Sequence, residues 1–454
     1  MPYEGATKEN KNKDSFKSLA HLSFWTFATT ILRFSIRILK SAIITRLLGP
    51  TNRGVFGLAI LIPEILVSFG NMGLGTANVY YIVKDHYPLK KVLGTTIVFT
   101  IFISLLLIGI GARCLFFEGI LKDSAQLLQK FAPIILASIP FILIWLYNQA
   151  FLIALKKIQS LNTFRIFESA LPLLFFLVFY LVTRDALQAA IKSWVLTILI
   201  IGFICFLILK NHQVYPPKFS KNYLKEGLSF GLREHFSNVF HMLLLRVDFF
   251  FISSLLGAEA LGYYTISVSV GELLLFLPQS VVVPFAPILL GLKQTDAEEF
   301  TPVVTRCIFF IMILACVALG LSGKLIIWIL FGKQFFPSFN PLLCLLPGMF
   351  ALGIFPILKI DLINRNKPGI VSLSSGFALL CNLVLNYFLI PRWGINGAAI
   401  SSSISYGLAV CLLLRVYLSQ SRHSLKEVMI LKYSDVVLIK QILTERRKRT
   451  KFAS

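Results

Sequence analysis

The stretch Ile44–Leu66 reads ITRLLGPTNRGVFGLAILIPEIL, and the stretch Ile252–Leu274 reads ISSLLGAEALGYYTISVSVGELL. Aligned without a gap at an offset of 208 residues, they share seven identities. A second pair of matching segments, Ala189–Ile191 and Ala398–Ile400, has an offset of 209 residues. Two pairs of matching segments, in the same order along the chain and at nearly the same offset, indicate that the chain is a repeat of two halves. The identical positions of the first half are Ile44, Leu47, Leu48, Gly49, Gly54, Glu64 and Leu66.

Each half is too apolar to fold as a soluble domain. Of 454 residues, 56% are hydrophobic and 14% are charged, whereas soluble domains carry about 25% charged residues. Apolar runs of about 20 residues recur along the chain, and a helix of that length crosses roughly 30 Å of hydrocarbon. We therefore predict an all-α polytopic membrane protein with twelve transmembrane helices in two six-helix bundles. The expected spans are 21–44, 55–83, 93–117, 128–155, 160–182, 186–210, 227–254, 262–290, 302–331, 340–364, 369–390 and 396–418.

The distribution of Lys and Arg predicts the orientation of these spans. With the N-terminus in the cytoplasm, 25 Lys and Arg residues fall on the cytoplasmic side and 8 on the opposite side. This threefold excess follows the positive-inside rule, so we expect both termini in the cytoplasm and the protein in the cytoplasmic membrane. The expected divisions are a cytoplasmic tail 1–20, a bundle 21–210, a cytoplasmic linker 211–226, a bundle 227–418 and a basic cytoplasmic tail 419–454.

Composition and motifs exclude several classes of function. The net charge of +23 would suggest nucleic-acid binding in a soluble protein, but basic cytoplasmic loops and a basic cavity explain it in a membrane protein. The seven cysteines form no C-x-x-C pair, which predicts neither a disulfide nor a metal site. The chain has no H-E-x-x-H, P-loop or G-x-S-x-G motif. We therefore expect neither a cofactor nor a nucleic-acid partner, and we do not expect an enzyme.

Three segments carry a family resemblance. Leu244–Tyr264, LLRVDFFFISSLLGAEALGYY, resembles the R-x-D…L-G…L-G-Y pattern that opens the second half of polysaccharide-type flippases. Thr45–Leu58, TRLLGPTNRGVFGL, is similar to the pattern in their first half, and Phe388–Tyr406, FLIPRWGINGAAISSSISY, to their C-terminal signature. With the span count, the resemblance covers nearly the whole chain. It points to the multidrug/oligosaccharidyl-lipid/polysaccharide (MOP) exporter superfamily and, within it, to the O-antigen-type flippases.

The resemblance implies a V-shaped pair of bundles around a central cavity that opens alternately to each side of the membrane. Its implied substrate is a glycan joined through pyrophosphate to a polyprenyl lipid. Transport in such families is coupled to an ion gradient, here of H⁺ or Na⁺. The implied partners are this anionic lipid-linked glycan, the bilayer, and the polymerase and glycosyltransferases of the same pathway.

A basic stripe lies inside the first expected span. Arg33, Arg37 and Lys40 fall within about 60° of one helix face at the angular step of an α-helix. A charge inside the bilayer is costly, so these side chains should face a cavity or a partner. Guanidinium groups bind phosphate oxygens bidentately, which favours a pyrophosphate-binding wall. The alternative is a basic face paired with acidic residues of neighbouring helices.

The seventh expected span holds further candidates. Arg246 is assigned to substrate binding together with the basic stripe. Asp248 and His241 are candidates to carry a coupling proton, because a His titrates near neutrality. An ion pair for Asp248 and a hydrogen-bonded interior position for His241 are the alternatives. Glu64 and Glu272 occupy equivalent positions of the repeat and serve either as ion-pair partners or as coupling carboxylates.

Other charged residues are expected to have lesser roles. Lys359 and Asp361 are expected at the cytoplasmic rim of their span. Four further cations lie close enough to span ends to extend toward the membrane surface and are assigned no role: Arg165, Arg306, Lys324 and Arg415.

Two other functions remain alternatives. A multidrug or cation exporter of the same superfamily would need carboxylates and aromatic residues in its cavity, whereas the first span is basic. A cell-wall lipid precursor flippase usually has two further spans. A membrane glycosyltransferase or polymerase is disfavoured by the absence of a long acidic outer loop.

Overall fold

The computed structural model describes residues 4–116, 124–210, 216–282, 294–365, 367–421 and 423–432, with the side chains of α1 described from Thr29 onward. Within these ranges the chain forms helices and no strand. A backbone in hydrocarbon satisfies its own hydrogen bonds as a helix, which is why apolar runs of this length fold in this way. The predicted all-α membrane fold is confirmed.

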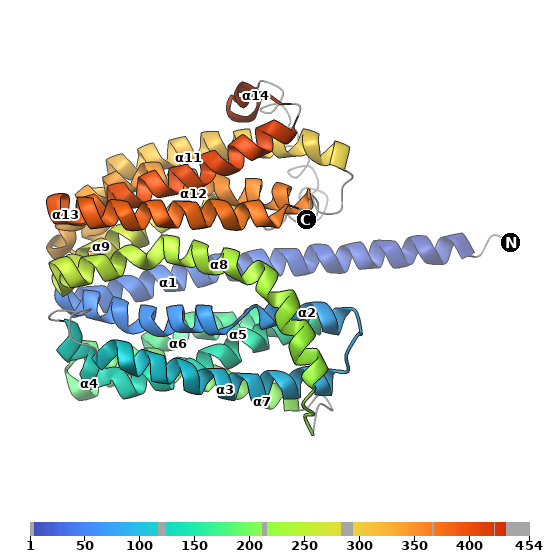
Figure 1. Ribbon diagram of the computed structural model, residues 1–454, viewed down its shortest axis with the longest axis horizontal. Coiled ribbons are helices and arrows are strands. Elements are labelled where there is room, and N and C mark those ends of the chain that lie inside the picture. Colours follow the sequence, from blue (N-terminus) through green and yellow to red (C-terminus); the bar gives the residue numbers. More distant parts are fainter. Residues whose placement is uncertain are drawn as a thin grey trace, which may run out of the picture. The chain divides into compact units, whose positions relative to one another are not determined.

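Fifteen helical elements lie in the described ranges, and the α-helices among them are labelled in Figure 1. In chain order they are α1 Glu4–Gly70, α2 Leu74–Val83, α3 Leu89–Phe116, α4 Ser124–Ala137, α5 Ile139–Ala154, α6 Ile158–Thr183, α7 Ala186–Lys210, α8 Lys221–Leu256, α9 Ala258–Gly271, η1 Glu272–Leu275, α11 Gln294–Phe331, η2 Lys333–Ser338, α12 Phe339–Asn364, α13 Pro368–Gln420 and α14 Leu425–Met429.

The number of spans agrees with twelve when the bent pair α4–α5 is counted as one span and the two helices with an internal break are each counted as two. Nine helices in the described ranges are long and apolar enough to cross a membrane, and the bent pair α4–α5 makes a tenth span. Two of the nine, in α1 and α13, each contain a sharp break, at Gly49 and at Gly394. Dividing each of these helices at its break raises the ten spans to twelve.

The break in α1 has a counterpart in the second half of the chain. Gly49 has φ 70° and ψ 174°, and Gly257, between α8 and α9, has φ 87° and ψ −177°. Only glycine adopts this backbone region at low cost. Pro50 then begins the new helical segment, where its missing N–H removes no helical hydrogen bond. The two glycines are 208 residues apart, so the sequence repeat coincides with a repeat in backbone conformation.

The helices form two compact units, Met1–His235 and Phe236–Ser454. In the first unit, α6 packs against α1 and α7; in the second, α12 packs against α11 and α13 (Figure 1). The boundary between the units falls within α8, which begins at Lys221, inside the stretch 211–226 expected as a linker. The first part of α8 therefore belongs to the first unit. It approaches α2 so closely that a Cβ on Gly231 would lie 2.5 Å from the Gly73 carbonyl oxygen.

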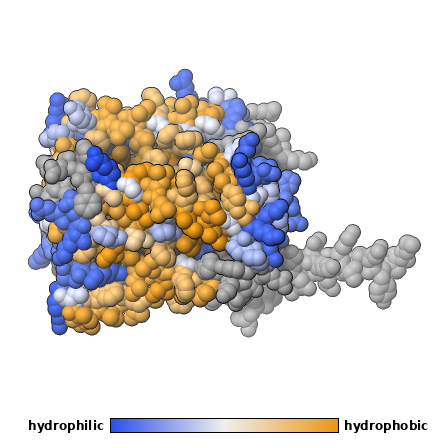
Figure 2. Space-filling view, turned by 60° about the horizontal axis from the view of Figure 1, so that its bottom comes forward, coloured by the Kyte–Doolittle hydropathy of each residue, from blue (hydrophilic) through white to orange (hydrophobic). Residues whose placement is uncertain are grey.

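The surface of the helices is apolar where a membrane would surround them. Large hydrophobic side chains are exposed along the spans, including Phe102, Val182, Leu321 and Leu373. On the face shown in Figure 2, hydrophobic residues cover a broad middle zone and hydrophilic residues gather at two opposite ends. An apolar surface of this size is unfavourable in water and is suited to contact with lipid tails.

Candidate functional site

The three basic residues of the stripe lie on α1 before its break. Arg33 and Lys40 are half-buried and Arg37 is exposed. Arg33 Nε donates a hydrogen bond to the Arg165 carbonyl oxygen of α6, at 3.2 Å. This contact fixes the start of the stripe against α6.

Helix α6 contributes a further cation to this region. Nε and Nη2 of Arg165 both donate to Oε1 of Gln149 on α5, at 3.2 and 3.0 Å. The expectation that Arg165 extends toward the membrane surface is therefore wrong. The amide oxygen of Gln149 holds its guanidinium inside the first unit, close enough to Arg33 for electrostatic repulsion.

The region also contains a carboxylate, Glu168, one turn along α6 from Arg165. Residues three apart lie on the same side of a helix, which brings the two side chains together. Oε1 of Glu168 accepts a hydrogen bond from Nε1 of the buried Trp145 on α5, at 3.1 Å. Glu168 is also close enough to Arg33 and Lys40 to attract both electrostatically.

Arg53 adds a cation from the segment that follows the break at Gly49. It is close enough to Lys40 for electrostatic repulsion, and its guanidinium lies 5.9 Å from the centre of the Phe56 ring. Its Nε is buried without a hydrogen-bond partner in the part of the chain that the structure describes. We define the basic cluster as these five cations: Arg33, Arg37, Lys40, Arg53 and Arg165.

Sequence reasoning places Arg53 in an outer loop and misses its position in the cluster. The signal was present, because Pro50 directly after Gly49 is typical of the first residue of a helix. That assignment would have put Arg53 about one turn inside a helix. For Glu168 and Arg165 the sequence carries no such signal, since their neighbours come from α1 and α5.

In the second unit, Arg246 and Glu272 form an ion pair. Nη2 of Arg246 lies 2.8 Å from Oε1 of Glu272, and both side chains are partly exposed. The Arg246 guanidinium also lies 5.5 Å from the centre of the Phe249 ring. Within the guanidinium group, Nη2 makes the contact with Glu272. Substrate binding by Arg246 and an ion-coupling role for Glu272 both remain predictions.

Asp248 lies in the interior of the second unit. It is 0% exposed, and Oδ2 accepts hydrogen bonds from the hydroxyls of Tyr264 and Ser402, the latter at 3.0 Å. Oδ1 accepts from the backbone N–H of Phe249, also at 3.0 Å. At the repeat offset of 208, Asp248 corresponds to Lys40 of the first half.

The polar surroundings of Asp248 extend along α13. Nδ2 of Asn382 donates to the Ser402 hydroxyl at 3.4 Å, and Nδ2 of Asn386 donates to Oδ1 of Asn382 at 2.8 Å. All three residues are fully buried. Oδ1 of Asn386 has no hydrogen-bond partner among the described residues. The network therefore offers an unused buried oxygen in addition to the carboxylate.

The other two candidates have different surroundings. His241 stacks on Phe355, with ring centres 4.9 Å apart and 15° between the planes, and its buried Nδ1 has no hydrogen-bond partner among the described residues. The alternative of a hydrogen-bonded His241 therefore does not hold at Nδ1. Glu64 lies after the break in α1 and is exposed. The repeat relates Glu64 to Glu272, and its role stays a prediction.

The end of the second unit holds two buried arginines. Asp361 is 1% exposed; it accepts from the Thr301 hydroxyl at 2.9 Å and pairs with Nε of Arg365 at 2.6 Å. Asp361 lies in the last turn of α12, near the end of its span as expected, but its side chain is buried there, with Arg365 and Thr301 as its partners. Nη1 of Arg365 also donates to the Gln420 carbonyl oxygen at 3.1 Å, which joins α12 to the end of α13.

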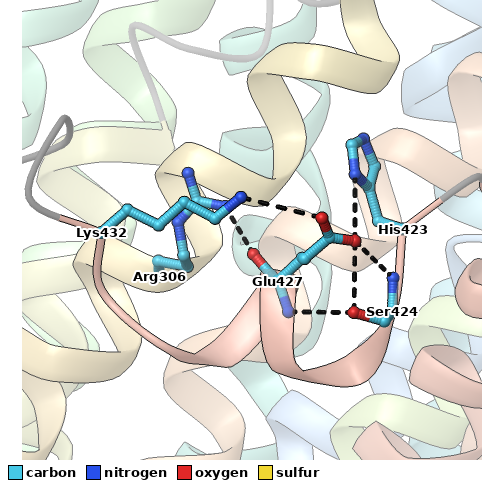
Figure 3. Close-up of polar contacts among 5 residues, drawn as sticks. All are labelled: Arg306, His423, Ser424, Glu427 and Lys432. Carbon is cyan, nitrogen blue, oxygen red and sulfur yellow. Dashed lines mark hydrogen bonds and ion pairs between the residues drawn. The ribbon is translucent and has the colours of Figure 1, made fainter.

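Arg306 joins α11 to α14 (Figure 3). It is 5% exposed and its Nη1 donates to the Glu427 carbonyl oxygen, so the expectation that it extends toward the membrane surface is wrong. Ser424 and Glu427 cap each other at the start of α14, and His423 and Lys432 lie 3.9 and 3.8 Å from the Glu427 carboxylate. Hydrogen bonds from Ser424 lower the pKa of Glu427.

The repeated helices, the apolar surface and the charges inside the spans define a polytopic membrane transporter. Residues 43–340 match the family model described as polysaccharide biosynthesis protein. Because that match covers more than half of the chain, this protein belongs to the polysaccharide biosynthesis protein family. It is also 29% identical over 422 residues to a candidate O-antigen transporter of Shigella flexneri, covering 88% of this chain and 98% of the relative.

Solved structures confirm the fold predicted for the MOP superfamily. The lipid II flippase MurJ, in an inward closed conformation, superposes with a TM-score of 0.68 and 15% identity over 94% of this chain and 100% of its own. An inward-facing multidrug resistance MATE family transporter of the MOP superfamily gives 0.70 and 15% identity over 86% and 98%. At these identities the likeness concerns the fold.

Proposed function

We propose that this protein flips a lipid-linked, negatively charged glycan unit across the cytoplasmic membrane. Its head group would be an oligosaccharide or polysaccharide repeat unit attached through pyrophosphate to a polyprenyl lipid. The head would cross beside the basic cluster while the lipid tail stays in the bilayer. The candidate O-antigen transporter of Shigella flexneri, similar over nearly its whole length, supports this substrate class.

The observation that carries the proposal is the basic cluster of the first unit. Five cations lie inside or at the edge of membrane-spanning helices, and Glu168 is a carboxylate placed among them. Cations in this setting require an anion or water as partner. The two phosphates of a pyrophosphate offer several oxygens at fixed spacing, and guanidinium groups bind such oxygens through paired N–H donors.

The same cluster argues against export of cationic drugs. A cationic substrate would meet like charges at Arg33, Arg37 and Lys40, and like charges repel strongly where little water screens them. The resemblance in fold to the MATE transporters therefore does not extend, in this proposal, to their multidrug substrates. The proposal contains no catalytic step.

We further propose that an ion gradient drives the cycle through Asp248. A buried carboxylate with three hydrogen-bond donors and the unused Asn386 oxygen nearby is suited to take up either H⁺ or Na⁺. The two units would rock against each other as in other transporters with parallel repeats. Both termini would lie in the cytoplasm. The polymerase and glycosyltransferases of the pathway would act before and after this step.

Complementation tests the proposed function. Wild type and the variants Arg33→Ala, Arg37→Ala and Lys40→Ala are expressed in a strain that lacks its surface-polysaccharide flippase, with membrane levels matched by blot. We expect wild type to restore surface polymer and each variant to lose most of it. Wild-type activity in all three variants would contradict a role for the basic cluster in holding the pyrophosphate.

A matched control separates the basic cluster from general charge effects. Arg184 caps the end of α6 in a left-handed conformation, outside the cluster. Arg184→Asn removes one positive charge and tolerates that conformation, so it should retain activity. A strain that makes the same lipid-linked unit as the source of the gene avoids failure through a mismatched sugar.

The coupling proposal has its own experiment. Purified protein is reconstituted in proteoliposomes, and uptake of H⁺ is compared with uptake of ²²Na⁺ for wild type and Asp248→Asn. We expect wild type to take up one of the two ions, and we expect Asp248→Asn to lose that uptake. Equal ion movement in both proteins would exclude Asp248 as the coupling site.

A further inference from the structure

Glu168 opposes the function of the cluster in which it lies. It contributes a negative charge next to Arg33 and Lys40, at the place where the proposed substrate would bring its own negative charges. It is not a surface residue that happens to lie nearby, because the buried Trp145 holds its Oε1 by a hydrogen bond of 3.1 Å. The chain therefore positions a carboxylate within an anion-binding region.

We propose that Glu168 is a resident counter-ion that weakens the hold of the basic cluster on pyrophosphate and so permits release of the transported head group. This inference rests on the proposed function. It assigns Glu168 a role in the affinity and turnover of the site, and Trp145 the role of positioning the carboxylate.

The physical argument is a balance between binding and release. A transport site must bind its cargo strongly enough to admit it and weakly enough to let it leave. Five cations in a partly dehydrated region would hold a pyrophosphate very tightly if nothing opposed them. One opposing charge several ångströms from the substrate reduces anion affinity by about tenfold or more at the effective dielectric of a protein.

The same carboxylate has a second effect when no substrate is bound. Five like charges repel one another, and among them Arg165 of α6 repels Arg33 of α1. Glu168 attracts both Arg33 and Lys40, so it reduces this repulsion. Its attraction for these cations stabilises the arrangement of the cluster, and its repulsion of the substrate's negative charges lowers the affinity for substrate.

Trp145 determines where the carboxylate points. Its indole N–H is the donor, and the ring packs against Phe164 of α6 with centres 6.2 Å apart. Without the N–H, the carboxylate is free to turn toward Arg33 or Lys40 and neutralise the cation more completely. Loss of the Trp145 donor should therefore weaken anion binding, whereas loss of the Glu168 charge should strengthen it.

The test measures affinity and turnover in the same proteins. Full-length wild type and Glu168→Gln are placed in lipid nanodiscs, and binding of a polyprenyl pyrophosphate is titrated. Surface polymer is measured at matched membrane levels in the complementation strain. We expect Glu168→Gln to bind about tenfold more tightly and to deliver several-fold less polymer, because release becomes slow.

Asp185→Asn is the matched control. Asp185 precedes α7 and accepts from the Gln188 N–H at 3.0 Å, a bond that an Asn side chain can also accept. It is 17 residues from Glu168, about 25 Å along the direction of α6. The variant makes the same change in net charge away from the cluster, so its affinity and turnover should equal those of wild type.

The outcomes separate this inference from the proposed function. If wild type binds and Glu168→Gln binds equally or more weakly, the counter-ion role is overturned and the flippase proposal stands. An equal gain in Asp185→Asn overturns it too, by showing an effect of net charge. If wild type binds no better than Lys40→Ala, the proposed function fails. If Glu168→Gln does not accumulate in the membrane, Trp145→Phe takes its place in the binding experiment. We expect Trp145→Phe to bind polyprenyl pyrophosphate several-fold more weakly than wild type. Unchanged or tighter binding would overturn the counter-ion role of Glu168.

Discussion

Gly49 and Gly257, 208 residues apart, break the chain with nearly the same backbone conformation. Their φ angles are 70° and 87°, and their ψ angles are 174° and −177°. In each half the break follows a long helical segment that carries charged residues, and Glu64 or Glu272 lies 15 residues after the break. The position of the charged side chains on either side of each break depends on a conformation that other residues adopt only with strain.

Gly49→Ala and Gly257→Ala should therefore each destabilise the protein by about 1–3 kcal/mol, the cost of holding an alanine in this backbone region. Thermal unfolding in detergent measures the loss. Gly109→Ala and Gly407→Ala are the controls, because both glycines are helical and an added Cβ meets nothing within 4 Å. The controls should be neutral or slightly stabilising. Equal melting temperatures for all four variants would contradict the expected strain.

Tyr264→Phe should destabilise the second unit by about 1–3 kcal/mol, because the buried Asp248 carboxylate loses one of its three hydrogen-bond donors. Tyr263→Phe is the matched control, since its hydroxyl pairs with Glu259 at the surface. Its loss should cost less than about 1 kcal/mol. Thermal unfolding compares the two variants, and a larger loss for Tyr263→Phe would argue against the importance of the buried network.

Arg246 and Glu272 should show energetic coupling in a double-mutant cycle. Removing either partner leaves the other charge uncompensated. The stability losses of Arg246→Gln and Glu272→Gln should therefore add up to more than the loss in the double variant. We expect a coupling energy of about 1 kcal/mol or more for this partly exposed pair inside a span. Additive losses, measured by thermal unfolding of the four proteins, would show that the two residues act independently.

Docking of α14 should depend on pH through Glu427. The pKa of Glu427 is lowered from its ordinary value of 4.5, chiefly by hydrogen bonds from Ser424. A lowered pKa means that the carboxylate stabilises the folded state above pH 4.5 and that this contribution is lost as the pH falls through the lower, folded-state pKa. Limited proteolysis after Met429 should therefore become faster in acid.

Two variants test the origin of that pH effect. Glu427→Gln should show fast proteolysis at neutral pH and lose the acid dependence, because its side chain no longer ionises. Arg306→Gln should also loosen α14, since it weakens the bond to the Glu427 carbonyl oxygen, but it should keep the acid dependence. Acid dependence in Glu427→Gln equal to that of wild type would assign the effect to another group.

Sequence reasoning succeeds where the signal lies along one helix. The apolar runs predict the spans, and the repeat predicts the equivalence of Gly49 and Gly257 before any angle is known. It fails where the partner comes from another helix. The pairing of Asp361 with Arg365, four residues further along the same helix, is readable from the sequence. The hydrogen bond from Thr301 of α11 to Asp361 is not, and neither is the carbonyl oxygen that α14 offers to Arg306. The hydropathy of the span gives no information on either contact.

The candidate site follows the same rule. The angular spacing of Arg33, Arg37 and Lys40 is a property of one helix and is readable from the sequence. The contribution of Arg165 and Glu168 arises from the packing of α6 against α1, which the sequence does not encode in any local pattern. Arg246 and Glu272 lie on opposite sides of the break at Gly257, so the sequence alone does not show that they form an ion pair.

The offset that relates Gly49 to Gly257 also relates Lys40 to Asp248, so one ancestral position now carries opposite charges in the two halves. If the chain arose by duplication of a six-helix gene, its copies have since divided their labour. The first half now carries the basic cluster, and the second surrounds a carboxylate with hydroxyl donors. In the proposed mechanism each half would therefore supply a charge that the other lacks at this position, and two copies of one half would not replace the pair.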